Sequence, residues 1–306
     1  MKTALVTGGA GFIGSNVVRL GLQAGWSITV LDNFSAGYVE NLPDTSALRV
    51  VRGDVRDRAA VDEALRGIDA VFHLAASVGN VRSIENPLDD SDVNVLGTLQ
   101  LLEGMRRAGV RRLVFSSSAA IFGEPRRLPI DEAHPMEPSS PYGVSKLAAE
   151  KHSQCYGRLH AIQVACLRYF NVYGVNQRYD AYGNVIPIFA TRLLKGEPLV
   201  IYGDGEQTRD FVDVEDVARA NWLALEKGAS GVFNIGSGVA ISINGLASVM
   251  QECAGRQVEI EHEAPRPGEV RHSVADLTAS RRRLRFDRQV DLRSGLTGYL
   301  SWLSSA

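Results

Sequence analysis

The sequence has few of the features that mark secreted, membrane-embedded or nucleic-acid-binding proteins. Its 306 residues include only three cysteines, Cys155, Cys166 and Cys253, without close spacing. Neither a disulfide framework nor a cysteine-based metal site is therefore indicated. No apolar run approaches the roughly 20 residues that span a bilayer, and the net charge of -2 offers no attractive field for nucleic acid. We expect a cytoplasmic protein without a signal peptide, bound metal, membrane partner or nucleic-acid partner.

What the sequence does contain is a regular alternation of short β-branched runs with helical patterns. The runs of the first half lie at residues 4–6, 28–31, 48–51, 70–72 and 112–115. This repetition predicts an α/β fold with a Rossmann-type, doubly wound parallel sheet covered on both faces. The pattern dissolves after Gly174, which predicts a first domain over 1–174 and a smaller C-terminal α/β lobe over 175–306. A later apolar run at 232–237 is expected to rejoin the first sheet.

A glycine-rich turn follows the first predicted strand. Gly8, Gly11 and Gly14 are spaced where a backbone turns tightly and approaches a pyrophosphate, with the first N–H groups of a helix facing the anion. The second strand ends in Asp32, about 20 residues further on, where a carboxylate can bind the adenosine ribose and would repel a 2′-phosphate. Asp32 could instead cap a turn. The pattern favours NAD over NADP and makes the first domain its binding domain.

Two later strand ends extend this site. Asp54 ends the third strand, where it could hold the adenine amino group or cap the loop. The small residues after His73 allow the chain to pass close beneath a cofactor. We interpret His73 itself as a structural histidine with satisfied hydrogen bonds rather than as an acid or base.

A hydroxyl, a phenol and an ammonium form a candidate acid/base set. Ser116, Ser117 and Ser118 end an apolar run, and Tyr142 and Lys146 share one face of a predicted helix because they are four residues apart. Bringing a free phenol from a pKa near ~10 to neutrality requires about 4 kcal/mol of stabilisation of the phenolate. A nearby ammonium and a positively charged nicotinamide could supply it. Together with a hydride carrier, this set indicates oxidation of a secondary alcohol.

Taken together, these motifs resemble the extended short-chain dehydrogenase/reductase family, in particular its NAD-dependent nucleotide-sugar epimerases. Later segments are similar to the same group, namely residues 168–174, 202–211 and 266–269. The resemblance spans nearly the whole chain. It implies that Tyr142 is the base for the 4-hydroxyl of the sugar and that Lys146 binds the nicotinamide ribose and lowers the phenol pKa. It also implies that Ser118 hydrogen-bonds the same oxygen.

The resemblance also implies two sets of binding residues. Those expected to contact NAD are Gly8, Gly11, Phe12, Ile13, Gly14, Asp32, Asn33, Ser35, Asp54, Val55, Leu74, Ala75, Ala76, Ser116, Tyr142, Lys146 and Tyr169. Those expected to contact a UDP-sugar are Arg82, Ser117, Ser118, Asn171, Arg178, Val185, Ile186, Tyr202, Gln207, Arg209, Arg266 and Glu269. Within the second set, Asn171 and Arg209 would contact the diphosphate, and Arg266 and Glu269 would hold the uridine ribose. Arg209 could instead pair with Asp204 or Asp213.

Two alanines bear on the reaction. Relatives that eliminate water carry an Asp-Glu pair directly after the catalytic hydroxyl, where this chain has Ala119 and Ala120. Since alanine transfers no proton, elimination loses a contribution of typically ~10²–10⁴-fold, and C4 epimerisation through a 4-keto sugar is predicted. A dehydratase or 4-ketoreductase that uses Cys155 or His134 is the same-fold alternative. A non-catalytic NAD-binding regulator is a second alternative.

The sugar and the oligomeric state are less constrained. Arg82 and Arg178 lie in segments that line the hexose in relatives, where Arg178 could meet the C6 carboxylate of a glucuronate or could pair elsewhere. Phe122 replaces a usual Tyr, and the small Ser273 leaves room for an N-acetyl group. Glucose, glucuronate and N-acetylglucosamine therefore remain open. By analogy we expect a homodimer formed by the helices predicted near 91–108 and 142–156, although their apolar faces could simply cover the sheet.

Overall fold

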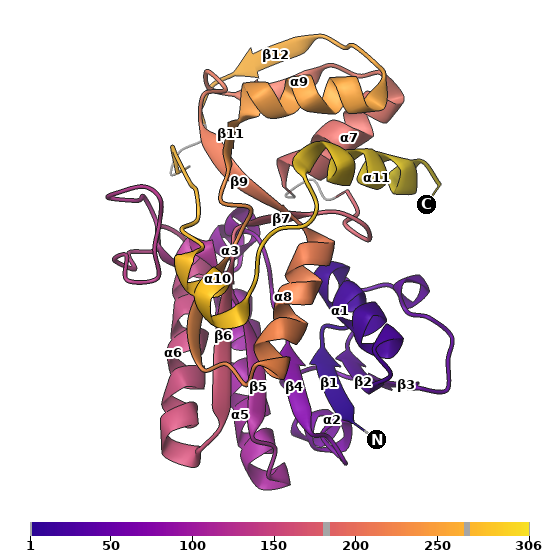
Figure 1. Ribbon diagram of the computed structural model, residues 1–306, viewed down its shortest axis with the longest axis vertical. Coiled ribbons are helices and arrows are strands. Elements are labelled where there is room, and N and C mark those ends of the chain that lie inside the picture. The colour runs from indigo at the N-terminus through magenta and orange to yellow at the C-terminus, as the bar shows by residue number, and fades with distance from the viewer. Residues whose placement is uncertain (1, 180–183, 266–269, 306) are drawn as a thin grey trace.

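The computed structural model describes residues 2–179, 184–265 and 270–305, and its main feature is a parallel seven-stranded sheet (Figure 1). The order across this sheet is β10-β6-β5-β4-β1-β2-β3, and every neighbouring pair is parallel. The predicted Rossmann-type fold is thereby confirmed. The strands are β1 (Thr3–Thr7), β2 (Ser27–Asp32), β3 (Leu48–Arg52), β4 (Ala70–His73), β5 (Arg112–Ser118), β6 (Gln163–Tyr169) and β10 (Gly231–Ile235).

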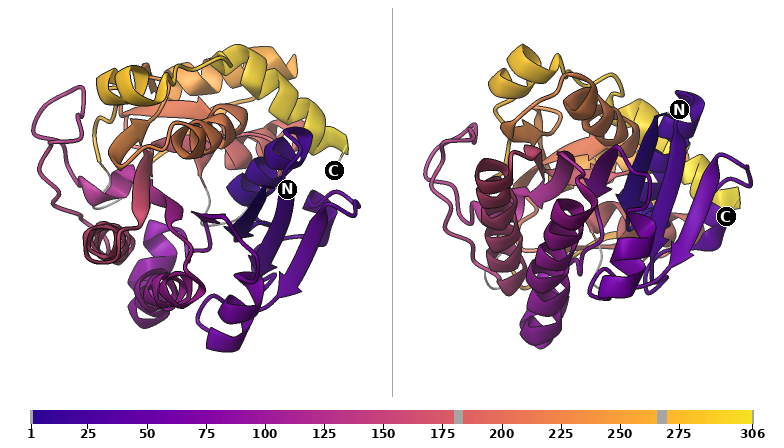
Figure 2. Two further views of the ribbon diagram at one scale, coloured as in Figure 1. Left: turned by 60° about the horizontal axis from the view of Figure 1, so that its bottom comes forward. Right: turned by 90° about the horizontal axis from the view of Figure 1, so that it is seen from below.

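Helices cover both faces of this sheet (Figure 2). One face packs against α1 (Phe12–Gln23), α8 (Val214–Glu226) and α10 (Thr278–Leu284), and the other against α2 (Arg58–Ala64), α5 (Gly97–Ala108) and α6 (Pro141–His160). Side chains alternate along a strand, so Ala4 and Val6 belong to one apolar cluster and Leu5 to the other. Because both faces are covered, apolar residues occur on both faces of the central strands, such as β1 and β4.

Residues from the second half of the chain contribute to this first layer. The pairing of β10 with β6 adds residues 231–235 to the edge of the sheet. Helix α8 packs against α1, where Trp222 donates its indole N–H to the carbonyl of Val17 at 2.9 Å. The two halves of the sequence are therefore interleaved in space.

A smaller lobe is built from two short sheets and the helices around them. Its sheets have the orders β11-β9-β7 and β12-β8, and a third apolar cluster joins them to the helices. No helix in the described ranges is long and apolar enough to cross a membrane. The elements are β7 (Asn171–Tyr173), α7 (Val185–Lys195), β8 (Leu199–Tyr202), β9 (Thr208–Asp213), β11 (Ala240–Ser242), α9 (Ile243–Ala254), β12 (Ile260–Glu263) and α11 (Leu292–Ser305).

Short helical segments lie along the carboxyl edge of the large sheet, where the loops after its strands meet. After β2 comes η1 (Val39–Asn41), and after β5 comes η3 (Ala119–Ile121). After β4, α3 (Asn80–Glu85) and α4 (Pro87–Ser91) lead into a π-helical turn, η2 (Asp92–Leu96), that continues into α5. In open α/β sheets, ligands bind at this edge.

A buried ion pair fixes α6 to the sheet. The guanidinium of Arg168 on β6 donates to both oxygens of Glu150 on α6, at 2.7 and 3.0 Å, and both residues are at most 1% exposed. Ser117 on β5 donates its hydroxyl to the same carboxylate at 2.7 Å. A bidentate, charge-assisted pair of this kind has little freedom to shift. It therefore sets where α6 lies over β5 and β6.

We predict that Glu150→Gln destabilises the protein by about 3–5 kcal/mol, because the buried guanidinium of Arg168 would lose its compensating charge. The measurement is urea-induced unfolding. The matched control is Glu252→Gln, which removes the exposed pair of Glu252 with Arg293 and should cost less than about 1 kcal/mol. Equal losses in the two variants would contradict this role of the buried pair.

Candidate functional site

The glycine turn after β1 lies too close to neighbouring backbone to hold a side chain. Gly8 has a φ of +68°, and a Cβ on Gly14 would lie 2.1 Å from the carbonyl oxygen of Gly8. Helix α1 begins at Phe12 without a side-chain cap and without an acidic residue in its first turn. Its first N–H groups are therefore available to an anion. These residues fit the pyrophosphate of a dinucleotide.

Asp32 at the end of β2 anchors two loops of this site. Its carboxylate accepts from the backbone N–H of Ala10 at 2.9 Å and of Phe34 at 2.8 Å. The turn-capping role that the sequence left open is thus present. An ionised carboxylate has about four acceptor positions, so ribose hydroxyls can bind the same group.

Three of the residues expected to contact NAD lie together. Asn33 donates to Asp54 at 2.8 Å and accepts from the backbone N–H of Ser35 at 3.0 Å. Arg56 donates to both oxygens of Asp54 at 2.8 Å and holds the pKa of that carboxyl well below its usual range. Asp54 is therefore an ionised acceptor at the carboxyl end of β3.

His73 has two protein partners and is neutral. Its ring nitrogens lie 2.7 Å from the hydroxyl oxygen of Thr7 and 2.9 Å from that of Thr98. Because the hydroxyl of Thr98 donates to the carbonyl of Asn94, we assign Nε2 as the protonated nitrogen. Burial lowers the pKa of His73 to about 3. The structural interpretation of His73 is confirmed.

Beside it, the end of β4 passes close to the glycine turn. Thr7 accepts from the backbone N–H groups of Leu74 and Ala75, both at 3.2 Å. A Cβ on Gly8 would lie 2.7 Å from the nitrogen of Ala75. The small residues expected beneath the cofactor thus border its pyrophosphate turn.

The catalytic candidates meet where β5 ends and α6 begins. Ser118 hydrogen-bonds the phenol of Tyr142 and accepts from the backbone N–H of Ala120 at 3.1 Å. A Cβ on Gly143 would lie 2.6 Å from the carbonyl oxygen of Ala120, so glycine allows α6 to approach η3 this closely. One turn later, the ammonium of Lys146 lies 4.7 Å from the ring centre of Phe115.

Burial shifts the phenol and the ammonium toward their neutral forms. It raises the pKa of Tyr142 to about 12, with the hydrogen bond from Ser118 opposing the rise. It lowers the pKa of Lys146 to about 8, with Asp90 and Glu150 opposing the fall. Forming the phenolate at neutrality therefore requires about 7 kcal/mol, at 1.36 kcal/mol per unit. This exceeds the requirement of a free phenol, so ligand-free Tyr142 is protonated.

Asn94 and Asp90 belong to this region and were missed from the sequence. Asn94 donates to the carbonyl of Ser77 and to the hydroxyl of Ser145, both at 3.0 Å, and accepts from the N–H of Ser77 at 2.9 Å. It also donates to Asp90 at 3.0 Å. Apolar periodicity does not reveal a π-helical turn, which is frequent at functional sites. The only sequence signal is the occurrence of polar residues at 90 and 94 inside a helical pattern.

Several expected contact residues have protein partners. The hydroxyl of Ser117 donates to the carboxylate of Glu150. Tyr169 donates to Asn221 at 3.0 Å and is also hydrogen-bonded by Ser116. Adjacent residues of β5 point to opposite faces, so Ser117 and Ser118 cannot serve one ligand with both side chains.

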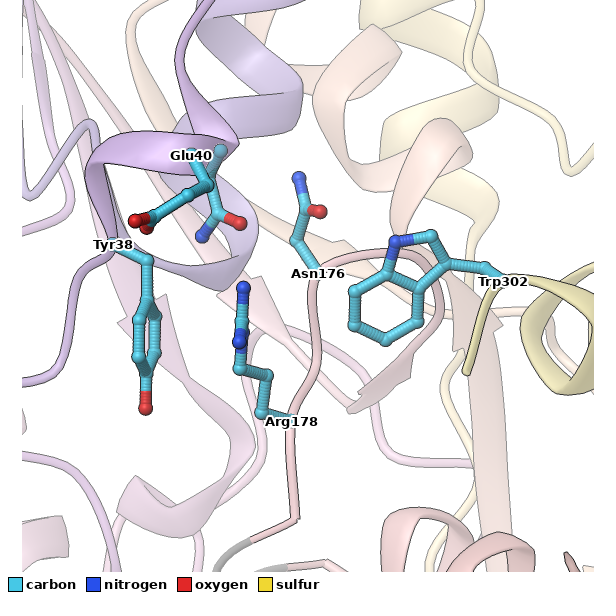
Figure 3. Close-up of a pocket in the computed structure, with 6 residues that line it drawn as sticks. Tyr38, Glu40, Asn176, Arg178 and Trp302 are labelled. Carbon is cyan, nitrogen blue, oxygen red and sulfur yellow. The ribbon is translucent and has the colours of Figure 1, made fainter. Parts of the chain in front are cut away.

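Arg178 lies on the β2 side of the site. Its guanidinium is 4.0 Å from the ring centre of Tyr38, and the two side chains lie alongside each other in a pocket of about 450 Å³ (Figure 3). The other lining residues are Glu40, Asn41, Asn176 and Trp302. Since β1 and β4 separate β2 from β5, the two strands are about 14 Å apart at ~4.8 Å per strand. The structure therefore does not bring Arg178 beside Tyr142.

The residues expected to bind the nucleotide part of the UDP-sugar lie in the smaller lobe. Gln207 donates to the carbonyl of Tyr202 and Arg209 to that of Thr208, both at 2.8 Å. Asp204, one of the two partners considered for Arg209, forms a bidentate pair with Arg271 at 2.8 Å. Asn171 begins β7, Val185 and Ile186 begin α7, and Arg82 is on α3. Arg266 and Glu269 lie outside the described residues.

Fold and site together define an NAD-dependent enzyme of the extended short-chain dehydrogenase/reductase class. Residues 4–236 match the model of the NAD dependent epimerase/dehydratase family. The chain is 40% identical, over 98% of each sequence, to a putative UDP-glucose 4-epimerase of Methanocaldococcus jannaschii. It is 34% identical to a dTDP-glucose 4,6-dehydratase of Streptomyces niveus, over 97% of this chain and 91% of that protein. The chain belongs to the NAD dependent epimerase/dehydratase family.

Solved structures agree with this assignment. The UDP-glucose 4-epimerase of Thermotoga maritima, solved with UDP-glucose, superimposes with a TM-score of 0.95 at 38% identity over 99% of each chain. That of Thermus thermophilus, solved with NAD, gives 0.92 at 38% identity, again over 99% of each. The protein is an NAD-dependent enzyme of the nucleotide-sugar epimerase and dehydratase type.

We predict that Gly14→Ala weakens NAD binding by about tenfold or more, since the added methyl would collide with the backbone of Gly8 where the pyrophosphate binds. Calorimetry of NAD binding to the protein freed of cofactor provides the measurement. Gly298→Ala is the matched control, because nothing lies within 4 Å of a Cβ at that helical position. Unchanged affinity in Gly14→Ala would refute the assignment of this turn.

Proposed function

We propose that the protein interconverts the C4 epimers of a UDP-hexose through a 4-keto sugar. The observation that carries this proposal is the convergence of Ser118, Tyr142 and Lys146 at the carboxyl edge of the sheet, directly before two alanines. We further propose residues 1–174, with the strand at 231–235, as the NAD-binding domain, and 175–306 mainly as the UDP-sugar lobe. The contact residues expected from the sequence for both ligands are part of the proposal, apart from the side chain of Ser117, which binds Glu150, and from Arg178 as a partner of a C6 carboxylate.

Each catalytic side chain has a distinct task. Tyr142 takes the proton from the 4-hydroxyl and later returns it to the 4-keto oxygen. Ser118 hydrogen-bonds the phenol and is in place to bond the same sugar oxygen. Lys146 stabilises the phenolate by its charge and holds the nicotinamide ribose. NAD, when bound, supplies the acceptor for the C4 hydride and its positive charge.

The alternative of elimination lacks a proton donor. Ala119 and Ala120 form η3 directly after Ser118 and transfer no proton. His134 accepts from the N–H of Arg126 at 3.0 Å, and its other ring nitrogen lies 2.9 Å from the carbonyl of Pro135, so both nitrogens are engaged. Cys155 is about 20 Å from Tyr142 along α6, at ~1.5 Å per residue. A non-catalytic regulator would have no need of the retained Tyr142 and Lys146.

For the sugar, UDP-glucose and UDP-galactose are the favoured pair. The stacking of Arg178 on Tyr38 removes the reason to expect recognition of a C6 carboxylate by that guanidinium. Ser273 donates its backbone N–H to Thr208 at 3.1 Å, and its small side chain leaves an N-acetyl group possible. UDP-N-acetylglucosamine is therefore the second substrate to test.

We predict that the purified protein converts UDP-glucose to UDP-galactose without added NAD, because the hydride is returned in each turnover. Tyr142→Phe should lower turnover by about 10²–10⁴-fold and leave NAD binding intact. Chromatography of the nucleotide sugars and cofactor analysis provide the two readouts. Loss of water detected by mass spectrometry would instead identify a dehydratase, and full activity of Tyr142→Phe would refute the assigned base.

A dimer through α6 and the helix formed by η2 and α5 is part of the proposal. Leu96 in η2 is 56% exposed, and Val144 and Leu159 on α6 are 54% and 69% exposed. Apolar side chains on neighbouring elements form a surface that a second copy can cover. The two helices would then meet their symmetry mates as a four-helix contact.

We predict that the protein has a solution mass of twice 33.2 kDa and that Leu96→Glu shifts it toward the monomer, because a charge would be buried at the contact. Light scattering after size-exclusion chromatography measures both. Leu194→Glu on α7, where Leu194 is also exposed, should leave the mass unchanged. A monomeric wild-type protein would exclude the dimer.

A further inference from the structure

Asp90 on α4 carries a buried carboxylate to which the proposed reaction assigns no task. It is 1% exposed, and one of its oxygens accepts from Asn94 at 3.0 Å. Asn94 also donates to the hydroxyl of Ser145 on α6 at 3.0 Å, so it bridges Asp90 and Ser145. The other oxygen is buried and has no hydrogen-bond partner among the described residues. Burial raises the pKa of this carboxyl, because an unpaired buried carboxylate is costly, so a nearby positive charge would favour its ionised form.

Lys146 on α6 is a candidate for this cation, since it interacts electrostatically with Asp90. Helix α4 packs against α6, and Ser145, which Asn94 joins to Asp90, directly precedes Lys146. The lysine is 4% exposed and has the ring of Phe115 on one side. Tyr142, one turn earlier on α6, is neutral in the ligand-free protein. Asp90 and Lys146 are thus two buried groups of opposite sign on packed helices.

Among the described residues, the other titratable groups around Lys146 carry no unbalanced negative charge. Glu150 on α6 is already neutralised by Arg168 on β6. His73 on β4 is neutral, because burial holds its pKa near 3. Burial also raises the pKa of Cys166 on β6 above its usual range, so its thiol stays protonated. By elimination, the uncompensated carboxylate of Asp90 is the counter-charge available to the ammonium.

We propose that Asp90 is a positioning residue that keeps Lys146 protonated and, through it, supports the acid/base step; its catalytic part rests on the proposed function. A carboxylate favours the charged form of a nearby amine, whereas burial alone favours the neutral one. The negative charge of the same carboxylate destabilises the Tyr142 phenolate and so raises the pKa of the phenol. Removing its charge should therefore lower the pKa of both groups and move both limbs of the pH profile of turnover to lower pH.

The decisive experiment titrates Lys146 directly. The chain contains five lysines, so carbon-13 labelling at lysine Cε gives few NMR signals, and Lys146→Arg assigns the one of interest. In the wild type, this signal should titrate with a pKa of about 8. In Asp90→Asn, which keeps the shape and the acceptor for Asn94, the midpoint should fall by on the order of one unit. The other lysines should not shift.

The matched control is Asp89→Asn. Asp89 adjoins Asp90 on α4, but its side chain is 64% exposed and faces Arg56 at 3.4 Å, so its removal should leave the Lys146 midpoint unchanged. If Asp90→Asn does not fold, Asp90→Ser gives the same comparison with a hydroxyl acceptor for Asn94. An unchanged midpoint on removal of the Asp90 carboxylate, or an equal shift in Asp89→Asn, would overturn the proposal.

The titration is independent of turnover. If the wild type lacks epimerase activity, the proposed function fails while the charge pairing of Asp90 with Lys146 is still decided by NMR. If the wild type is active, the alkaline limb of turnover should move to lower pH in Asp90→Asn. A limb that stays in place although the NMR midpoint has shifted would overturn the catalytic part of the proposal alone.

Discussion

The ion pair between Glu150 and Arg168 is the constraint on which the geometry of the site depends. It joins α6 to β6, and Ser117 extends the same carboxylate's contacts to β5. Two charges removed from water must remain paired, so α6 cannot slide or rotate without breaking them. Tyr142 and Lys146 lie on this helix, and their approach to the end of β5 is therefore set from within the protein core.

Burial shifts the pKa values of the acid/base groups at this site so that their neutral forms are favoured. The phenol of Tyr142 resists ionisation and the ammonium of Lys146 gives up its proton more easily than in water. A phenolate therefore forms only when positive charge is close by. Under the proposed function, the basicity of Tyr142 would therefore depend on the bound oxidised cofactor, and proton abstraction would occur only when a hydride acceptor is present.

The sheet and the core of the site could be predicted from sequence because their signals are local. The glycine turn, Asp32 and the Tyr142-Lys146 spacing each follow from the conformation of a short segment. The placement of Arg178 against Tyr38 and the contacts of Asp90 depend on segments that are distant in sequence. Hydrophobic periodicity contains no information about such contacts. The sequence therefore predicted least well the contacts of polar residues whose partners lie on another helix or strand.

The strand β10 has a consequence for how this chain can be built. It covers the edge of β6, yet it belongs to the second half of the sequence. A nascent or truncated chain that stops short of Ile235 presents β6 as an open sheet edge, and such edges recruit foreign strands. Residues 1–174 alone therefore lack the strand that covers this edge of the sheet. The strand that covers the edge of β6 is synthesised only after much of the smaller lobe.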